Sequence, residues 1–258
     1  MLNQKPMLGD LPDGTRFPHW PKALYAMNEN SGSIVNDLSG NGNNGTIVGA
    51  VWKPGKFGCA IENDDSTAKY IQIASPFGTT RTSWTVVVWV MMYSLPSVTG
   101  DASILGMEES LNGPAIYTND STDTFTLYTG SAVHDTGKSV AVYTWYQIAV
   151  ATDDNQTTVK FYVNGRLEYT NSSFQWDDSA DPWYFLNWSG GYKPWNGLID
   201  NAAIFSRTLP ARQIAYLSRN PFPWFIEDEV SHLYLPPTGI SMPLLMQQMN
   251  HFNGGMAA

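Results

Sequence analysis

An aromatic-rich segment holds the residue types best suited to binding a ligand. The sequence from Asp181 to Trp195, DPWYFLNWSGGYKPW, places five large rings around a Gly-Gly turn: Trp183, Tyr184, Trp188, Tyr192 and Trp195. Exposed aromatic rings offer flat apolar faces on which a sugar ring or a protein partner can pack. Alternate residues of a strand over 183–187 would instead have to face the core. The segment therefore predicts either a glycan-binding surface, or core and subunit-interface residues.

The carboxylates and histidines form no pattern suited to catalysis. Glu108 and Glu109 are adjacent, so on a strand their side chains would point to opposite faces. The acidic cluster at residues 227–229 lies in a proline-bounded segment. The four histidines are scattered without metal-ligand spacing. No Gly-x-Ser-x-Gly nucleophile motif or phosphate-binding glycine loop occurs. We therefore do not expect an enzyme.

Composition and charge exclude several classes of partner. Charged residues make up 14% of the chain, and the net charge is −9. An acidic chain poor in Lys and Arg offers no basic surface to nucleic acid and no attraction to anionic membranes. No run approaches the ~18 apolar residues of a membrane helix, and the first 20 residues lack the apolar region of a signal peptide. Cys59 is the single cysteine, so no intrachain disulfide is expected.

The elements that must position these residues are short strands separated by turns. Residues 84–92 form a nearly continuous apolar run, which predicts a strand buried on both faces. Asn164-Gly165 predicts a two-residue hairpin turn. Spacing over residues 209–217 predicts one short helix, with Thr208 as its N-cap. Many strands, frequent turns and almost no helix indicate an all-β sandwich of two antiparallel sheets.

Both ends of the chain read as extended arms. Residues 1–19 are punctuated by Pro and Gly and show no periodicity. Residues 221–258 begin with Pro-Phe-Pro-Trp, which cannot continue a helix or a central strand. This tail is too apolar for a solvated linker, so it should pack on this domain or on a partner. We expect an N-terminal arm over 1–19, a sandwich over 20–220 and an anchoring tail over 221–258.

Six motifs in order resemble the laminin-G-like jelly-rolls of the concanavalin A-like lectin/glucanase superfamily. They are DLSGNGNNGT at 37–46, WKPGKFGCA at 52–60, SWTVVVWV at 83–90, WYQIAV at 145–150, KFYVNG at 160–165 and NGLIDNAAIFSRTL at 196–209. The resemblance rests on motif order and covers residues 24–217. It implies a two-sheet antiparallel jelly-roll. A weaker resemblance, RNPF at 219–222 and LYLP at 233–236, is to tails that follow this domain in bacteriophage structural proteins.

The resemblance also implies where calcium and catalysis would be found. Many relatives hold a structural Ca²⁺ through Asp and Asn side chains and loop carbonyls, which suit a hard cation. Asp37, Asn41 and Asn43 share one turn, and Asp200 matches the family's Ile-Asp pair, so these four are candidate calcium ligands. Alternatively, Asp37 and the asparagines hydrogen-bond their own turn. The glucanases of this superfamily need an E-x-D-x-x-E pattern that brings two carboxylates to the sugar, and this chain lacks it.

These observations lead to a functional expectation with alternatives. We expect a non-enzymatic virion surface protein, either a capsid decoration or a fibre component. Its jelly-roll would face host-surface glycans, and its arms would bind capsid or fibre proteins of the same virion. A homo-oligomer is expected, with neither nucleic acid nor membrane as a partner. The main alternative is a carbohydrate-binding module of a bacterial or viral adhesion protein, and a third is a degenerate glucanase.

Overall fold

The computed structural model describes residues 21–77, 83–107, 114–130, 132–153, 157–172 and 181–220. The two expected arms, 1–19 and 221–258, lie outside these residues, and so do Glu108, Glu109 and the acidic cluster at 227–229. The expected division of the chain into arm, sandwich and tail therefore stays a prediction.

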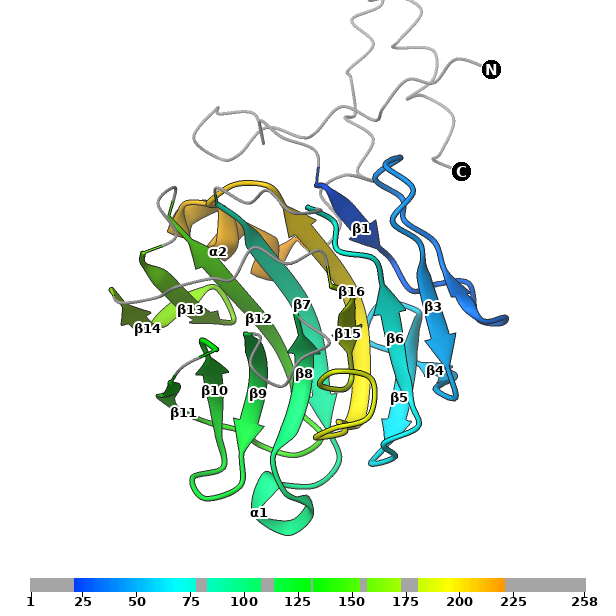
Figure 1. The fold of residues 1–258 in the computed structure, drawn as a ribbon, viewed down its shortest axis with the longest axis horizontal. Helices are drawn as coiled ribbons and strands as arrows, with labels where there is room; N and C mark the ends of the chain where they lie inside the picture. The colour runs from blue at the N-terminus through cyan, green and yellow to red at the C-terminus, as the bar shows by residue number, and fades with distance from the viewer. Residues whose placement is uncertain are drawn as a thin grey trace, which may run out of the picture.

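Two antiparallel sheets pack face to face (Figure 1). Sheet I has the spatial order β14 (Arg166–Asn171), β13 (Val159–Val163), β12 (Trp145–Thr152), β7 (Thr85–Met92), β16 (Asn196–Phe205), β5 (Cys59–Asp64) and β4 (Val51–Pro54), with β1 (Ala23–Tyr25) paired to β16. Sheet II has the order β11 (Val133–Ser139), β10 (Thr124–Tyr128), β9 (Ala115–Asn119), β8 (Ala102–Gly106), β15 (Trp183–Phe185), β6 (Tyr70–Ile73), β3 (Gly45–Val48) and β2 (Ile34–Val35). The prediction of an all-β, two-sheet antiparallel sandwich is confirmed.

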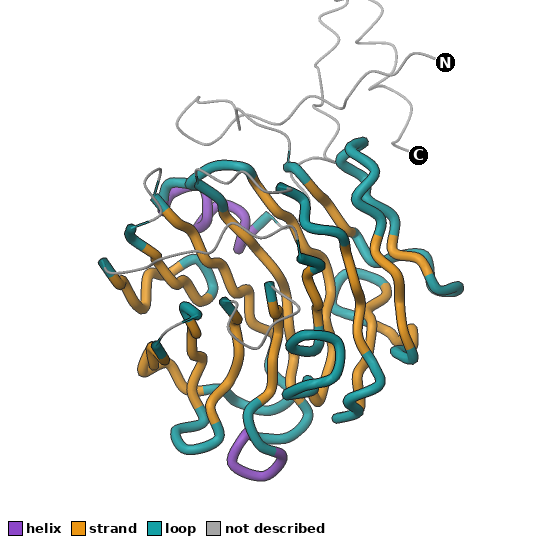
Figure 2. Tube along the Cα trace, in the orientation of Figure 1, coloured by secondary structure: helices purple, strands orange, loops and turns teal. Residues whose placement is uncertain are grey.

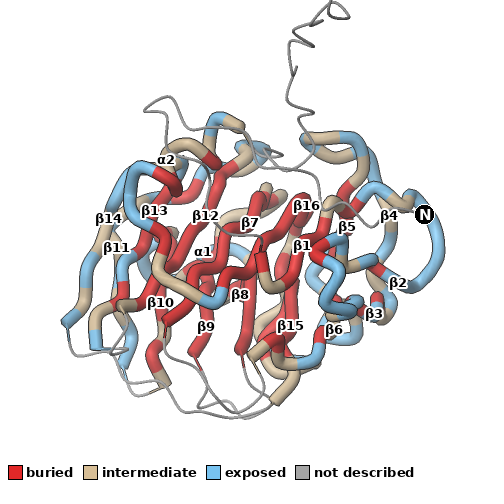
Figure 3. The backbone as a smooth tube through the Cα atoms, turned by 90° about the horizontal axis from the view of Figure 1, so that it is seen from above, coloured by how far each residue is buried: buried red, intermediate tan, exposed pale blue. Residues whose placement is uncertain are grey.

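The core lies between the sheets because successive side chains of a strand point to opposite faces. In β12, Tyr146, Ile148 and Val150 belong to the central core cluster, while Ala149 and Ala151 face outward into a second cluster. Figure 3 shows the buried residues concentrated along the strands of both sheets. Strand β7 is buried along nearly its whole length, which confirms the prediction for residues 84–92.

Helix α2 (Ala211–Arg219) covers the outer face of sheet I. Its buried Ile214 and Leu217 pack with outward-facing residues of β1, β7, β12 and β16. The predicted helix exists, but its N-cap was predicted wrongly. The Thr208 hydroxyl donates to the Thr152 carbonyl, and Pro210 is the N-cap without a side-chain cap hydrogen bond. The helix therefore begins after Pro210, whose ring restricts the backbone there.

Two shorter features complete the described fold. The hairpin between β13 and β14 has φ of 51° at Asn164 and 78° at Gly165, as the predicted two-residue turn requires. A one-turn helix, α1 (Pro96–Thr99), connects β7 of sheet I to β8 of sheet II. Neither helix in the described ranges has the length and hydrophobicity needed to cross a bilayer.

Candidate functional site

The loop from Leu186 to Trp195 folds back across the outer face of sheet II. Figure 1 draws this loop in yellow between β15 and β16, and Figure 2 shows it as an irregular turn in front of the strands. Trp188 and Tyr192 exchange two backbone hydrogen bonds, of 2.7 and 3.0 Å. Trp188 lies on Gly106 of β8, where an added Cβ would come within 3.0 Å of the tryptophan Cα and Cδ1 atoms. The absence of a side chain at Gly106 thus lets the loop settle on the sheet.

The backbone of this loop is held in a costly conformation. Leu186, Ser189 and Lys193 have φ of 65°, 55° and 48°, and Gly190 has φ of 69°. Left-handed backbone is unfavourable for residues with a Cβ and persists only where surrounding structure enforces it. Such residues concentrate at binding and catalytic sites. The loop therefore has the backbone signature of a functional segment.

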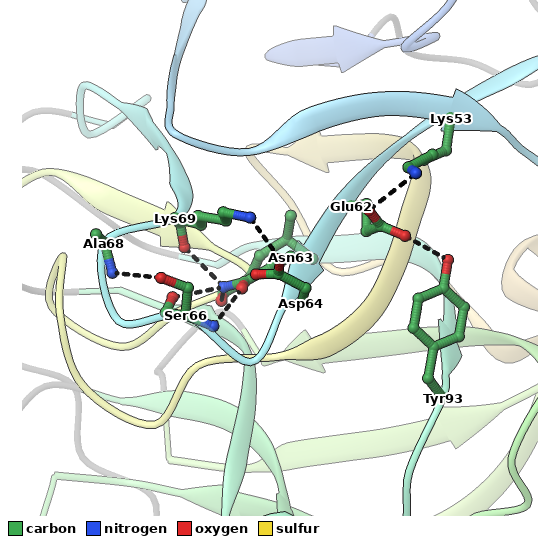
Figure 4. A network of polar contacts seen from close by, with 9 residues as sticks. Lys53, Glu62, Asn63, Asp64, Ser66, Ala68, Lys69 and Tyr93 are labelled. Atoms are coloured by element: carbon green, nitrogen blue, oxygen red, sulfur yellow. Dashed lines mark hydrogen bonds and ion pairs between the residues drawn. The ribbon is translucent and has the colours of Figure 1, made fainter.

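Hydrogen bonds from two buried asparagines hold the loop in this conformation. The Asn63 side-chain nitrogen donates to the carbonyls of Lys69 and Leu186, at 2.8 and 3.0 Å. The Asn187 side-chain oxygen accepts the backbone N–H of Tyr192 at 2.7 Å, and its nitrogen donates to the Thr67 carbonyl at 3.2 Å. Figure 4 shows Asn63 reaching the turn over residues 66–69. The loop on sheet II is therefore tied to a second loop that follows β5.

Aromatic rings surround Trp188 on the outer face. Its ring centroid lies 5.9 Å from that of Tyr117 on β9, 5.1 Å from that of Tyr128 on β10 and 6.2 Å from that of Tyr192. Burial, and secondarily the Asp101 carboxylate, raise the pKa of Tyr117 to about 12. Tyr117 is thus a neutral hydrogen-bonding group throughout the physiological range.

A paired cation sits over these rings. The Lys193 ammonium lies 4.7 Å from the Tyr117 ring centroid, 5.0 Å from that of Trp188 and 5.6 Å from that of Tyr192. It also forms a 2.6 Å ion pair with Asp101, and both side chains are 19% exposed. The pair therefore leaves a donor group and an acceptor group partly accessible at the edge of the rings while its charges cancel.

The expectation that these five rings form an exposed platform is contradicted for four of them. Trp183, Tyr184, Trp188 and Trp195 are at most 4% exposed, whereas Tyr192 is 47% exposed. Trp183 lies in the central core, and the indole N–H of Trp195 donates to the Met91 carbonyl at 3.2 Å. The alternative interpretation, that these rings are buried, holds for four of the five. Tyr192, which directly follows the Gly190–Gly191 turn, is the ring of the five that remains accessible.

Sequence reasoning missed the other members of this cluster. Tyr117 and Tyr128 alternate with the core residues Ile116 and Leu127 on β9 and β10, so the period of two already placed them on the outer face. No local signal joins Lys193 to Asp101, because they are 92 positions apart.

The turn expected to bind calcium is held by its own side chains. The Asp37 carboxylate accepts backbone N–H groups of Leu24, Ser39 and Asn43 at 3.0, 2.8 and 2.9 Å. The side-chain nitrogens of Asn41 and Asn43 both donate to the carbonyl of residue 22, at 2.9 Å each. The alternative interpretation of this turn is therefore confirmed. Its side chains tie residues 37–43 to the start of β1.

Asp200, the fourth expected ligand, stabilises a different turn. It lies fully buried on β16, and its Oδ2 atom accepts the Phe57 N–H at 2.8 Å. Its Oδ1 atom has no hydrogen-bond partner among the described residues. Burial raises the pKa of this carboxyl to about 6. Across the described ranges no three His, Cys, Asp or Glu side chains converge, and Asp37 and Asp200 hydrogen-bond to separate turns.

Solved structures share this fold at low sequence identity. Domain 4 of AbnA, a GH43 extracellular arabinanase from Geobacillus stearothermophilus, in complex with arabinotriose, is 22% identical with a TM-score of 0.61; 77% of this chain and 98% of that domain are covered. The binding domain of Paraclostridial Mosquitocidal Protein 1 is 15% identical with a TM-score of 0.61, covering 78% and 52%. Trypanosoma rangeli sialidase in complex with the inhibitor DANA is 14% identical with a TM-score of 0.63, covering 82% and 35%. This chain therefore spans about half of the toxin's binding domain and about a third of the sialidase.

The matches to known proteins support the expected family but not the expected bacteriophage origin. No curated protein matches the sequence at a significant level. Nothing in the matches supports the bacteriophage origin that the tail motifs suggested. The family model described as the concanavalin A-like lectin/glucanases superfamily matches residues 65–215. Because that match spans more than half of the 258 residues, the chain belongs to the concanavalin A-like lectin/glucanases superfamily.

Proposed function

We propose that this chain is a carbohydrate-binding domain that holds a sugar chain on the outer face of sheet II, at Tyr192. The observation that carries the proposal is the strained loop from Leu186 to Trp195. It buries Trp188 on the sheet and presents the half-exposed Tyr192 beside the Lys193–Asp101 pair. The strained backbone and the hydrogen bonds of Asn63 and Asn187 together hold the ring of Tyr192 in place.

The chemistry of this surface suits a sugar. A sugar ring has apolar C–H faces that pack on an aromatic ring, and hydroxyls that both donate and accept. Tyr192 supplies the ring, and the accessible edges of Lys193 and Asp101 supply a donor and an acceptor. Trp188 supports Tyr192 from beneath, so little side-chain entropy is lost on binding.

The family relationship favours carbohydrate as the ligand. The superfamily is described by its lectins and glucanases, and one structural neighbour is an arabinanase domain in complex with arabinotriose. We propose binding without hydrolysis, because the sequence lacks the E-x-D-x-x-E carboxylate pattern. A carbohydrate-binding module is thus better supported than the virion surface protein, and an adhesion protein is one setting for it.

The proposal is tested by measuring binding of the purified protein to arabinan, laminarin and xylan with affinity electrophoresis. Calorimetry then measures the affinity for oligosaccharides of each polymer. Tyr192→Ala should weaken binding by about tenfold or more, as expected for loss of a stacking contact worth ~1.4 kcal/mol. Tyr192→Phe is the matched control and should retain most of the affinity, since it keeps the ring.

Trp188→Ala should instead lower the free energy of unfolding by about 3–5 kcal/mol, because it opens a cavity. Unchanged binding in Tyr192→Ala would refute the site, and no binding to any polymer would refute the function.

Display on a virion through residues 1–19 and 221–258 stays a prediction, as do capsid or fibre partners, host-surface glycans and a homo-oligomer. Finding this chain at a fixed stoichiometry in purified particles would support it. Its absence from purified particles would contradict the virion setting, and the proposed carbohydrate-binding function would be unaffected.

A further inference from the structure

A second exposed aromatic group lies on the outer face of sheet I. We call it the Tyr143 patch, made of Tyr93, Tyr143, Trp145, Glu62 and Lys53. Tyr143 is 69% exposed, which is more than Tyr192. Tyr93 follows the outward-facing Met91 at the end of β7, whereas the intervening Met92 lies in the core. Trp145 pairs with Met91 across β12 and β7, so its side chain shares this face.

The exposed ring is supported from beneath by a chain of contacts. The ring centroids of Tyr143 and Tyr93 are 5.8 Å apart, with 32° between the ring planes. The Tyr93 hydroxyl donates to the Glu62 Oε1 atom at 2.9 Å, and the Glu62 Oε2 atom lies 3.4 Å from the Lys53 ammonium. Figure 4 shows Glu62 between Lys53 and Tyr93. Tyr143 therefore rests on a ring that is itself fixed to β5.

The backbone of Tyr143 is strained in order to place this ring. Its φ is 54°, a left-handed value that is unfavourable for a bulky side chain. The conformation is held by a 2.7 Å hydrogen bond from the Tyr143 N–H to the Met92 carbonyl. A glycine would take this position without strain. The tyrosine at this position neither enters the core nor relieves the backbone, which points to a role for the exposed ring.

We propose that the Tyr143 patch is a second carbohydrate-binding site, selective for neutral sugars. Tyr143 is 69% exposed and its ring contacts that of Tyr93, so much of the ring remains accessible for stacking. Two lysines in or next to this patch are held in ion pairs, Lys53 with Glu62 and Lys69 with Asp64, so neither of them is an unpaired cation that would recruit an acidic sugar. The inference takes its class of ligand, carbohydrate, from the proposed function. The two sites are otherwise independent, because they lie on different sheets. A domain with both sites could bridge two glycan chains.

The experiment compares six proteins: the full chain, Tyr192→Ala, Tyr143→Gly, the double variant, and the controls Tyr143→Phe and Val133→Ala. Binding is measured to arabinan, laminarin and xylan as neutral probes and to polygalacturonate as an acidic one. Tyr143→Gly removes the ring from a position where glycine carries no backbone strain, so the melting temperature should not fall. Tyr192→Ala should keep residual affinity for a neutral polymer, and the double variant should lose about tenfold more. Tyr143→Phe should bind like the full chain, and Val133→Ala, an exposed apolar change on β11, should have no effect.

The possible results separate this inference from the proposed function. Loss of all binding in Tyr192→Ala alone would overturn the second site and keep the first. Loss of all binding in Tyr143→Gly with unchanged behaviour of Tyr192→Ala would keep the second site and overturn the first. A preference for polygalacturonate would overturn the neutral selectivity. A lowered melting temperature in Tyr143→Gly would show that the ring serves packing, and absence of binding by the full chain would overturn both sites.

Discussion

At the scale of single residues, buried and half-buried polar side chains organise the turns of this domain. Asp37 and Asn63 satisfy several backbone groups each, which offsets the cost of removing them from water. Asp200 is different, because one carboxylate oxygen has no partner among the described residues. Burial raises the pKa of Asp200 to about 6.

Asp200 should make the free energy of unfolding depend on pH. Its carboxyl has a pKa of about 6 in the folded chain and 3.8 as its ordinary value. Between these values the folded protein holds a proton that the unfolded chain has released, so this residue's contribution to stability falls as pH rises from about 4 to about 6. The two-unit shift corresponds to about 3 kcal/mol. Denaturant unfolding of the full chain and Asp200→Asn at pH 4 and pH 7 measures it. Parallel pH profiles for the two proteins would contradict the assignment.

At the scale of elements, the edge strands β11 and β14 meet at His134. Its Nδ1 atom lies 3.1 Å from the Tyr169 hydroxyl and 3.2 Å from the Asn171 side-chain nitrogen, and its Nε2 atom lies 3.4 Å from the Thr129 hydroxyl. An amide nitrogen only donates, so Nδ1 must accept and Nε2 carries the hydrogen of a neutral ring. Burial lowers the pKa of His134, which agrees with a neutral ring joining the two sheets.

Acidification should loosen this edge. Below its ordinary pKa of 6.5 the unfolded chain takes up a proton on His134 that the folded protein resists, so stability falls as pH drops through this range. Protonated Nδ1 would also face the Asn171 amide as a second donor. Amide hydrogen exchange of β11 should therefore increase from pH 7.5 to pH 5 more than that of β7. His134→Gln should remove most of this difference, and an NMR-measured His134 pKa above 6.5 would contradict the argument.

At the scale of the whole molecule, the first strand and the last helix of the described sandwich both pack on sheet I. Strand β1 pairs with β16 at Ala23–Ile204 and its neighbours, and α2 buries Ile214 and Leu217 on the same face. Leu24 of β1 belongs to the cluster that α2 covers. The start and the end of the sandwich therefore depend on one shared apolar cluster.

Residues 20–220 should consequently fold without the remaining chain, as a monomer. Size-exclusion chromatography and thermal melting test this. Ending the chain at residue 209 should remove α2, expose the outer cluster and lower the melting temperature or cause aggregation. An insoluble 20–220 protein would show that residues 1–19 or 221–258 contribute to the fold.

The fold class follows from the amino-acid sequence alone, because the signals for strands and turns are local. Alternation along β12, the apolar run of β7 and the Asn164-Gly165 turn each depend on neighbours in the chain, and motif order identified the family. The tertiary structure decided the site, because a ring is exposed or buried according to contacts with distant residues. Gly106 lets Trp188 settle on sheet II, and Asp101 reaches Lys193 across 92 positions. Tyr192 and Tyr143 were left exposed by loop conformations that no local pattern encodes, since left-handed residues other than glycine are imposed by the surrounding fold.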